Sequence, residues 1–453
     1  MLRQLSGRSE LYAAPVPGVL SCGAYVPYRR LDRSAIATVF GGTPGKGRRS
    51  VASFDEDTTS MAVEAARACL RSAPEATPPP DSLWFSTTEP TYLDKTNATA
   101  IHAALQLDPS CPALDANGAV RSAVGALRAG LAGRGTTLAV AADIRTGLPT
   151  SGEESSGGDA AAALLLGDGP GMAELVGGAS VTQEFTDRWR VPGEHRSRLW
   201  EDRFGEQAYL ACGDQAWDAG LKDAQLTHDD VDVVVVAGTH ARAVSRLRSK
   251  LNGVDDLSSS VGMTGAAGPG LLLTSVLESS SPGQVIALVA LADGADVFHF
   301  RRTDAAFEPA RPVAAQAAGG AEVAYGKFLA WRQVVTVEPP NRPEPARVSS
   351  SAAARRLGWK YGLVVDDRSL ADEVGTIVSF TIDHLVYSPS PPVVFAIVDF
   401  EGGARVPCEL TDVDPAEVET GMRVEMTFRR LFTSDGIANY FWKARPVRGE
   451  SVR

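Results

Sequence analysis

The chain has 453 residues, of which 44% are hydrophobic and 22% are charged, and this balance excludes a wholly disordered, collagen-like or coiled-coil protein. At roughly 150 residues per domain, this length predicts two or three folded domains. The 44 Lys and Arg residues against 55 Asp and Glu residues leave a net charge of −11, which repels phosphate backbones and argues against nucleic acid as a partner.

Cysteine usage and hydropathy indicate the compartment. The five cysteines are Cys22, Cys69, Cys111, Cys212 and Cys408. None belongs to a CxxC pair, so we expect neither a disulfide framework nor a metal site. The N-terminal residues lack the apolar core of a signal peptide, and no apolar run approaches the roughly 18 residues that span a bilayer. We therefore expect a cytoplasmic protein in a reducing compartment, with no membrane contact.

An N-terminal extension, residues 1–17, precedes an α/β domain over residues 18–302. In this domain short apolar runs alternate with alanine-rich helical stretches, which is typical of buried strands covered by helices. The predicted strands are 82–86, 137–141, 231–236 and 284–291. The predicted helices are 57–72, 96–106, 119–133, 206–223, 241–251 and 265–278. Residues 160–166 form a small-residue strand, where close backbone packing favours Gly and Ala.

A Pro/Ala/Gly-rich linker is predicted for residues 303–359, where the sequence EPPNRP at 338–343 resists regular structure. Five β-rich runs follow at short spacing within residues 360–446. Five short strands separated by turns indicate a small all-β barrel of the OB-fold type. A tail, residues 447–453, ends the chain.

Five ordered motifs carry a resemblance to a known family. They are STTEPTY at 86–92, LDANGAV at 114–120, GDAAA at 158–162, RFGEQAY at 203–209 and GMTGAA at 262–267. Together they resemble the thiolase superfamily, and the pattern is most similar to the bacterial and archaeal type of 3-hydroxy-3-methylglutaryl-CoA (HMG-CoA) synthase. The resemblance implies a duplicated, five-layered α-β-α-β-α domain that handles acyl-CoA.

The barrel segment resembles the OB-fold family that accompanies thiolases in acyl-CoA-handling complexes, through GTIVSFT at 375–381 and SPSPP at 388–392. Relatives of this kind usually carry a zinc ribbon of four cysteines ahead of the barrel. Residues 360–372 contain no cysteine, so we expect no zinc. The slight acidic excess of this part favours protein docking over binding of single-stranded nucleic acid.

The catalytic positions that the resemblance implies are changed. Val120 stands at the position of the nucleophilic cysteine, and valine has no lone pair that could attack a thioester. Ala237 stands at the position of the catalytic histidine in a gapless alignment, although a short shift would bring His240 there. Met263 replaces an asparagine, and a thioether cannot donate the hydrogen bond that an oxyanion hole requires.

Three residues remain as candidates. Glu89 stands where the synthases hold a general acid/base, with capping of its loop as the alternative role. His240 is the second catalytic candidate. Arg242 stands where the family carries a basic residue near the CoA phosphates, and a guanidinium suits that task, although a solvated helix face is an equal alternative.

This combined loss predicts a catalytically degenerate subunit of an acyl-CoA-processing complex, present as a homodimer or as a heteromer with a thiolase or synthase paralogue. An alternative is a nucleophile-independent retro-aldol lyase acting on a β-hydroxyacyl-CoA, with Glu89 or His240 as the base. A second alternative is an HMG-CoA synthase-type acyltransferase, which Val120 argues against. We expect no cofactor other than a CoA thioester as ligand, and the sequence leaves open whether the chain is an enzyme.

Overall fold

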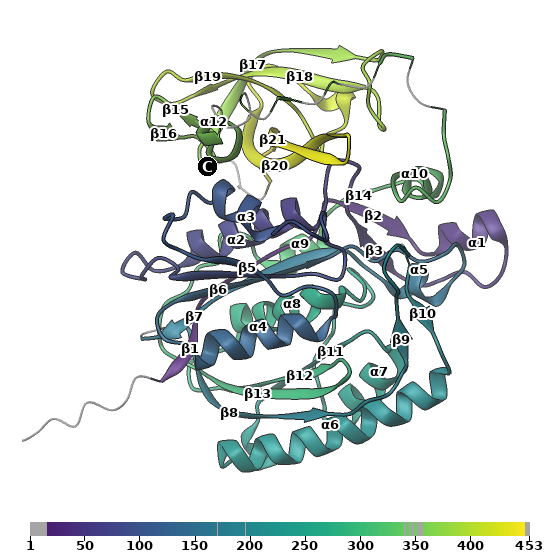
Figure 1. Ribbon diagram of the computed structural model, residues 1–453, viewed down its shortest axis with the longest axis vertical. Coiled ribbons are helices and arrows are strands. Elements are labelled where there is room, and N and C mark those ends of the chain that lie inside the picture. The colour runs from purple at the N-terminus through teal and green to yellow at the C-terminus, as the bar shows by residue number, and fades with distance from the viewer. Residues whose placement is uncertain are drawn as a thin grey trace, which may run out of the picture.

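The computed structural model describes residues 16–448, apart from 170, 195, 339–340, 344–345, 347, 350 and 352–356. Almost all of the predicted N-terminal extension and C-terminal tail lie outside the described residues. The described part forms an α/β domain with a smaller β-barrel seated on one side of it (Figure 1). None of the helices in this part is long and apolar enough to cross a bilayer.

A nine-stranded sheet consists of two similar halves. The first half contains β5 (Ala113–Asp115), β4 (Ser82–Ser86), β6 (Thr137–Asp143), β7 (Ala160–Asp168) and β1 (Pro17–Tyr25). The second contains β11 (Val233–Gly238), β12 (Val285–Leu291), β13 (Gly294–Arg302) and β8 (Ala173–Thr182). In both halves a parallel pair, β4–β6 or β11–β12, continues into antiparallel neighbours. This repeated pattern is the duplication that the sequence resemblance implies.

Helices complete five layers (Figure 1). The outer layers contain α2 (Thr58–Ser72) and α3 (Ala98–Ala104) on the first half-sheet, and α6 (Asp202–Ala224) and α7 (Ala241–Lys250) on the second. Between the half-sheets lie α4 (Arg121–Ala132) and α8 (Gly268–Ser279), whose leucines and valines share one core cluster with strands of both halves. The expected α-β-α-β-α layering is confirmed.

Close packing of α2 on β1 requires glycine at position 23. A Cβ atom on Gly23 would lie 2.2 Å from the backbone nitrogen of Cys69 in α2. Because both partners are backbone, neither can rotate away, and only a residue without a Cβ fits. This contact sets how closely the first helical layer, and the loop that precedes it, approach the sheet.

Part of the predicted linker packs on the α/β domain. This part includes α9 (Val313–Ala318), β14 (Ala321–Glu322) and α10 (Tyr325–Trp331). β14 pairs with β2 (Arg29–Asp32), which pairs with β3 (Arg48–Val51), and α1 (Ser34–Phe40) follows β2. The Ala and Gly residues that suggest a linker in the sequence are interrupted by buried apolar side chains, and these hold the segment to the domain: Val313, Val323, Tyr325, Phe328 and Leu329. The structure therefore extends this domain beyond residue 302.

The C-terminal barrel has the strand order β19-β18-β17-β20-β21. Its strands are β17 (Val374–Asp383), β18 (Val393–Phe400), β19 (Arg405–Glu409), β20 (Arg423–Ser434) and β21 (Ile437–Pro446). A bridge between Leu410 and Ala444 joins the two ends of the sheet, and alternate residues of β18 point into the core. Ahead of the barrel lie α12 (Leu357–Gly362), β15 (Val364–Val365) and β16 (Arg368–Ser369). The predicted five-stranded barrel is confirmed.

The barrel docks on α2 and the preceding loop through buried charges. Three pairs each join a barrel cation to a carboxylate of the α/β domain: Lys443 with Asp55, Arg429 with Glu56, and Arg445 with Glu64. All six side chains are at most 3% exposed. Buried carboxylates of this kind are costly unless they are paired. Glu64 also pairs with Arg67 of its own helix, whereas the cations that pair with Asp55 and Glu56 come from the barrel.

Candidate functional site

The candidate site begins at the N-terminus of α4. Gly118 adopts a φ of 106° in the turn from β5 to α4, and its N–H donates to the Thr87 carbonyl at 3.0 Å in the loop after β4. Val120 occupies the cap position of α4 and makes no side-chain cap hydrogen bond. An apolar, half-buried side chain therefore stands at the point where a helix N-terminus would activate a nucleophile.

Two further positions of the site are also apolar. Ala237 lies near the end of β11, is 3% exposed and belongs to the central core. Met263 lies in the loop before η2 (Gly265–Ala267), where its N–H donates to the Ser156 carbonyl at 2.8 Å. Its side chain packs against the core cluster under α6 and α7. Neither side chain offers a donor or an acceptor for chemistry at a carbonyl.

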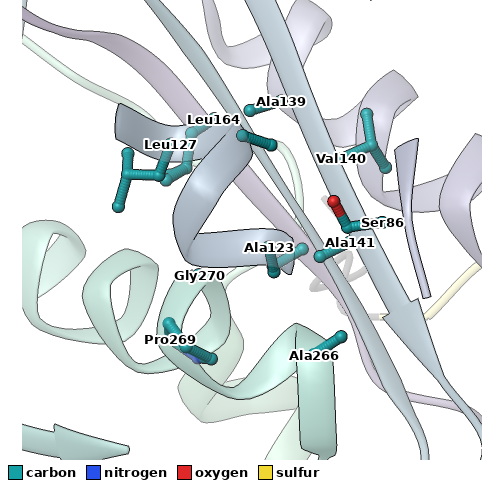
Figure 2. Close-up of a pocket in the computed structure, with 12 residues that line it drawn as sticks. Ser86, Ala123, Leu127, Ala139, Val140, Ala141, Leu164, Ala266, Pro269 and Gly270 are labelled. Carbon is teal, nitrogen blue, oxygen red and sulfur yellow. The ribbon is translucent and has the colours of Figure 1, made fainter. Parts of the chain in front are cut away.

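Small cavities lie beside this region. Figure 2 shows one between α4, β4, β6 and α8, with a volume of about 30 Å³. It is lined by alanines, leucines and Ser86, whose hydroxyl is buried without a hydrogen-bond partner among the described residues. A second cavity, of about 20 Å³, lies against Met263 and Gly238. Spaces of this size have room for one or a few water molecules but not for an acyl chain.

His240 begins α7 as its N-cap. Its Nδ1 accepts from the Ala243 N–H at 3.2 Å, and its Nε2 donates to the Asp202 carbonyl at 2.9 Å. The ring packs on Tyr209, with 5.9 Å between the ring centroids. Both nitrogens are therefore engaged in holding α6 to α7, which gives His240 a structural role.

Asp187 is a buried carboxyl next to His240. A Cβ atom on Gly205 would lie 2.1 Å from Asp187 Oδ1 and 3.1 Å from the His240 ring, so glycine is needed where these groups meet. Burial raises the pKa of Asp187 above its usual range, although His240 and Arg188 oppose the shift. A carboxyl perturbed by burial beside a specific partner is a common feature of functional sites, and no motif in the sequence marks Asp187.

Glu89 lies in the loop after β4 and is partly exposed. Its carboxylate forms an ion pair with Arg190, which also donates to the Thr88 carbonyl. The side chains of Glu89 and Arg190 are 38% and 22% exposed, respectively. Glu89 is thus accessible from solvent and carries a fixed counter-charge.

Arg190 and a second charged cluster behind it were not predicted. Arg190 directly follows β9 (Arg188–Trp189), which pairs with β10 (Arg198–Leu199). Arg145 contacts both Asp143 and Glu153, and Arg188 also pairs with Glu153. Burial opposes ionisation of Glu153, but Arg145 and Arg188 outweigh it and lower its pKa to about 2. In the sequence these residues are scattered charges, because the elements that carry them are brought together only by the fold.

Arg242 lies on the solvent-facing side of α7. Its guanidinium is 2.9 Å from Asp202 Oδ2, and the two side chains are 60% and 57% exposed. An exposed pair of this kind contributes little stability and exchanges readily with other anions. The Arg242 guanidinium is therefore accessible to a phosphate group in solvent. No contact among the described residues joins Arg242 to Glu89.

Both domains are similar to known proteins. Residues 369–429 match the ChsH2 C-terminal OB-fold domain family. The chain is 27% identical over 306 residues to the hydroxymethylglutaryl-CoA synthase of Methanosphaera stadtmanae, and 29% identical over 307 residues to that of Methanopyrus kandleri. Each match covers 63% of this chain and 88% of the relative.

Solved structures show the same fold. An HMG-CoA synthase complexed with CoA aligns with a TM-score of 0.57 at 16% identity, over 74% of this chain and 93% of that chain. The curacin biosynthetic pathway HMG synthase, in complex with acetyl donor-ACP, aligns with a TM-score of 0.58 at 17% identity, over 70% and 88%. The α/β domain is therefore similar to hydroxymethylglutaryl-CoA synthases and has their thiolase-like fold, and the C-terminal barrel matches the ChsH2 C-terminal OB-fold domain family.

Proposed function

We propose that this chain is an acyl-CoA-related thiolase-fold protein that forms no acyl-enzyme and serves as a catalytically degenerate subunit of an acyl-CoA-processing complex. The observation that carries the proposal is Val120 at the N-terminus of α4. Covalent acyl transfer needs a nucleophile there, and the apolar Ala237 and Met263 supply neither a base nor an oxyanion donor.

The cysteines of the chain support this proposal. All five are buried and unpaired, and burial raises the pKa of each thiol above its usual value. A thiol held in its protonated form is a poor nucleophile. Unpaired cysteines also support the proposed location in a reducing, cytoplasmic compartment.

A second thiolase-fold chain, identical or paralogous, is the proposed partner. β5 is the last strand of the sheet, and among the described residues its outer edge carries no further strand. Leu114 on this strand is 42% exposed, and Leu93 in the loop beyond Glu89 is 85% exposed. An open strand edge with exposed leucines favours association with another chain.

A retro-aldol lyase is the second candidate, and the accessible Glu89 carboxylate favours it. In this reaction Glu89 would remove the proton of a β-hydroxyl group. The alkoxide would then form the carbonyl group of a released aldehyde or ketone as the Cα–Cβ bond breaks. The electron pair of that bond would form the enolate of the shorter acyl-CoA, and protonated Glu89 would return its proton to the enolate carbon. No acyl-enzyme is required.

Intact-mass measurement tests the main proposal. The full chain is incubated with acetyl-CoA and with acetoacetyl-CoA, and we expect no mass increase of an acetyl group and no condensation product. Detection of an acetylated wild-type chain would refute the proposal. Cleavage of 3-hydroxyacyl-CoA substrates that is abolished in Glu89→Gln but retained in Glu75→Gln, a change at an exposed glutamate outside the Glu89 loop, would establish the lyase instead.

A further inference from the structure

The loop that carries Glu89 is held by the OB barrel as well as by its own domain. The Tyr440 hydroxyl in β21 donates to Asp57 Oδ2 at 2.8 Å and lies 3.3 Å from Thr91 Oγ1. The Ala438 N–H, at the start of the same strand, donates to the Tyr92 hydroxyl at 2.8 Å. Thr91 and Tyr92 follow Glu89 by two and three residues.

The α/β domain holds the same loop from the other side. The Thr58 hydroxyl donates to the Glu89 carbonyl at 2.8 Å, and the Glu89 N–H donates to Thr87 Oγ1 at 2.9 Å. Asp57, the partner of Tyr440, is the N-cap of α2 and directly precedes Thr58. The Tyr440 hydroxyl therefore contacts Asp57, which directly precedes the residue that hydrogen-bonds to Glu89, and it also contacts Thr91, which follows Glu89 in the loop.

Burial strengthens these contacts. Tyr440 is 3% exposed, so water does not compete for its hydroxyl, and a hydrogen bond to a carboxylate in such a place is strong. The residues between Glu89 and Asn97 belong to neither helix nor strand. Their course therefore depends on side-chain bonds of this kind rather than on a regular backbone ladder.

We propose that Tyr440 is a positioning residue for the Glu89 loop, so that the OB barrel forms part of the acyl-CoA site and is more than a docking module. The inference rests on the proposed function, because it takes the loop as a wall of that site. It predicts that a change in the barrel, more than 340 residues away in the chain, alters the loop and the affinity for an acyl-CoA.

Hydrogen exchange of the full-length chain tests the link to the loop. Tyr440→Phe removes the hydroxyl but keeps the ring, which stacks on Phe428 at 5.3 Å. We expect exchange over residues 88–97 to rise about tenfold, as befits loss of a hydrogen bond to a charged group, with the sheets unchanged. The matched control is Tyr387→Phe, because no hydrogen bond of the Tyr387 hydroxyl occurs among the described residues.

Tyr92→Phe removes a separate contact between the loop and the barrel, the hydrogen bond that the Tyr92 hydroxyl accepts from the Ala438 N–H. It keeps the role of the barrel in holding the loop testable if Tyr440→Phe unfolds the whole chain. Exchange over 88–97 that stays at the wild-type level in Tyr92→Phe and in a folded Tyr440→Phe would overturn the inference.

Calorimetric titration with acetoacetyl-CoA separates the inference from the proposed function. We expect Tyr440→Phe to bind this probe about tenfold more weakly than the wild type, and Tyr387→Phe to bind it equally well. Equal affinity of wild type and Tyr440→Phe, despite a loosened loop, would also overturn the positioning role. If the wild type does not bind acetoacetyl-CoA, the proposed function fails, whereas the exchange result still decides whether Tyr440 holds the loop.

Discussion

Replacement of Lys443 by methionine tests the buried charges between the two domains. Its Nζ lies 3.0 Å from Asp55 Oδ2 and 2.8 Å from Glu409 Oε2. Lys443 is 2% exposed and Asp55 is fully buried, whereas Glu409 is 28% exposed. Burial opposes ionisation of Asp55, but Lys443, Arg429 and the Ser53 hydroxyl overcome it and hold its pKa well below the usual range.

The expected loss follows from this geometry. Two unit charges 3.0 Å apart attract by about 5 kcal/mol at an effective dielectric constant of about 20. Methionine recovers part of this through its apolar packing, and Arg429 still faces Asp55. We therefore expect Lys443→Met to lower the free energy of unfolding by about 3 to 4 kcal/mol, within the range for breaking one partner of a buried pair.

Urea unfolding followed by circular dichroism measures this loss. The matched control is Lys250→Met, because Lys250 pairs with Asp214 at 2.7 Å on the surface, where the side chains are 58% and 44% exposed; this change should cost less than about 1 kcal/mol. Asp55→Asn in the Lys443→Met background should restore most of the loss, since the unpaired charge is gone. If Lys443→Met costs no more than Lys250→Met, the reasoning about the interface is wrong.

Three further predictions concern other parts of the molecule. His299 is fully buried, and burial lowers its pKa to about 4. As the pH falls, the imidazole is therefore protonated in the unfolded chain before it is protonated in the folded chain. The free energy of unfolding should fall by roughly 3 kcal/mol between about pH 6.5 and about pH 4. His299→Leu should remove this part of the acid sensitivity, as urea midpoints at pH 7.5 and 5 would show; an unchanged pH dependence would contradict it. Gly23→Ala should cost about 3 kcal/mol through its clash with α2, whereas Gly125→Ala, which meets nothing within 4 Å, should stabilise α4 by up to about 1 kcal/mol in thermal unfolding. Light scattering should show an assembly of two thiolase-fold chains that Leu114→Glu dissociates, and an unaltered mass would argue against β5 as the interface.

The elements that depend on local pattern could be predicted from the sequence. The strand expected at 82–86 is β4, and those expected at 137–141 and 284–291 are β6 and β12 within two residues at each end. Short apolar runs between turn residues carry enough information for this. The five strands of the barrel were predicted for the same reason.

The contacts that depend on distant residues could not be predicted. Asp55 and Glu56 look like a solvated acidic turn before α2, because their partners Lys443 and Arg429 are far away in the chain. Arg190 likewise gives no local signal of its pairing with Glu89. His240 was weighed as a base, yet its place at the start of α7 gives it a capping role that only the fold reveals.

The docking of the barrel on the α/β domain has a consequence for folding during synthesis on the ribosome. Glu64 and the Phe428 N–H that it accepts from are 364 residues apart, and at about 5 to 20 residues per second a ribosome needs roughly 20 to 70 s to cover that interval. Until the barrel is made, Asp55 and Glu56 of the nascent α/β domain lack the cations with which they pair, Lys443 and Arg429, whereas Glu64 already has Arg67 beside it. A chain that ends before β21 lacks Lys443, the barrel cation that pairs with Asp55. We therefore expect such a chain to be less stable and more open to proteolysis than the full chain.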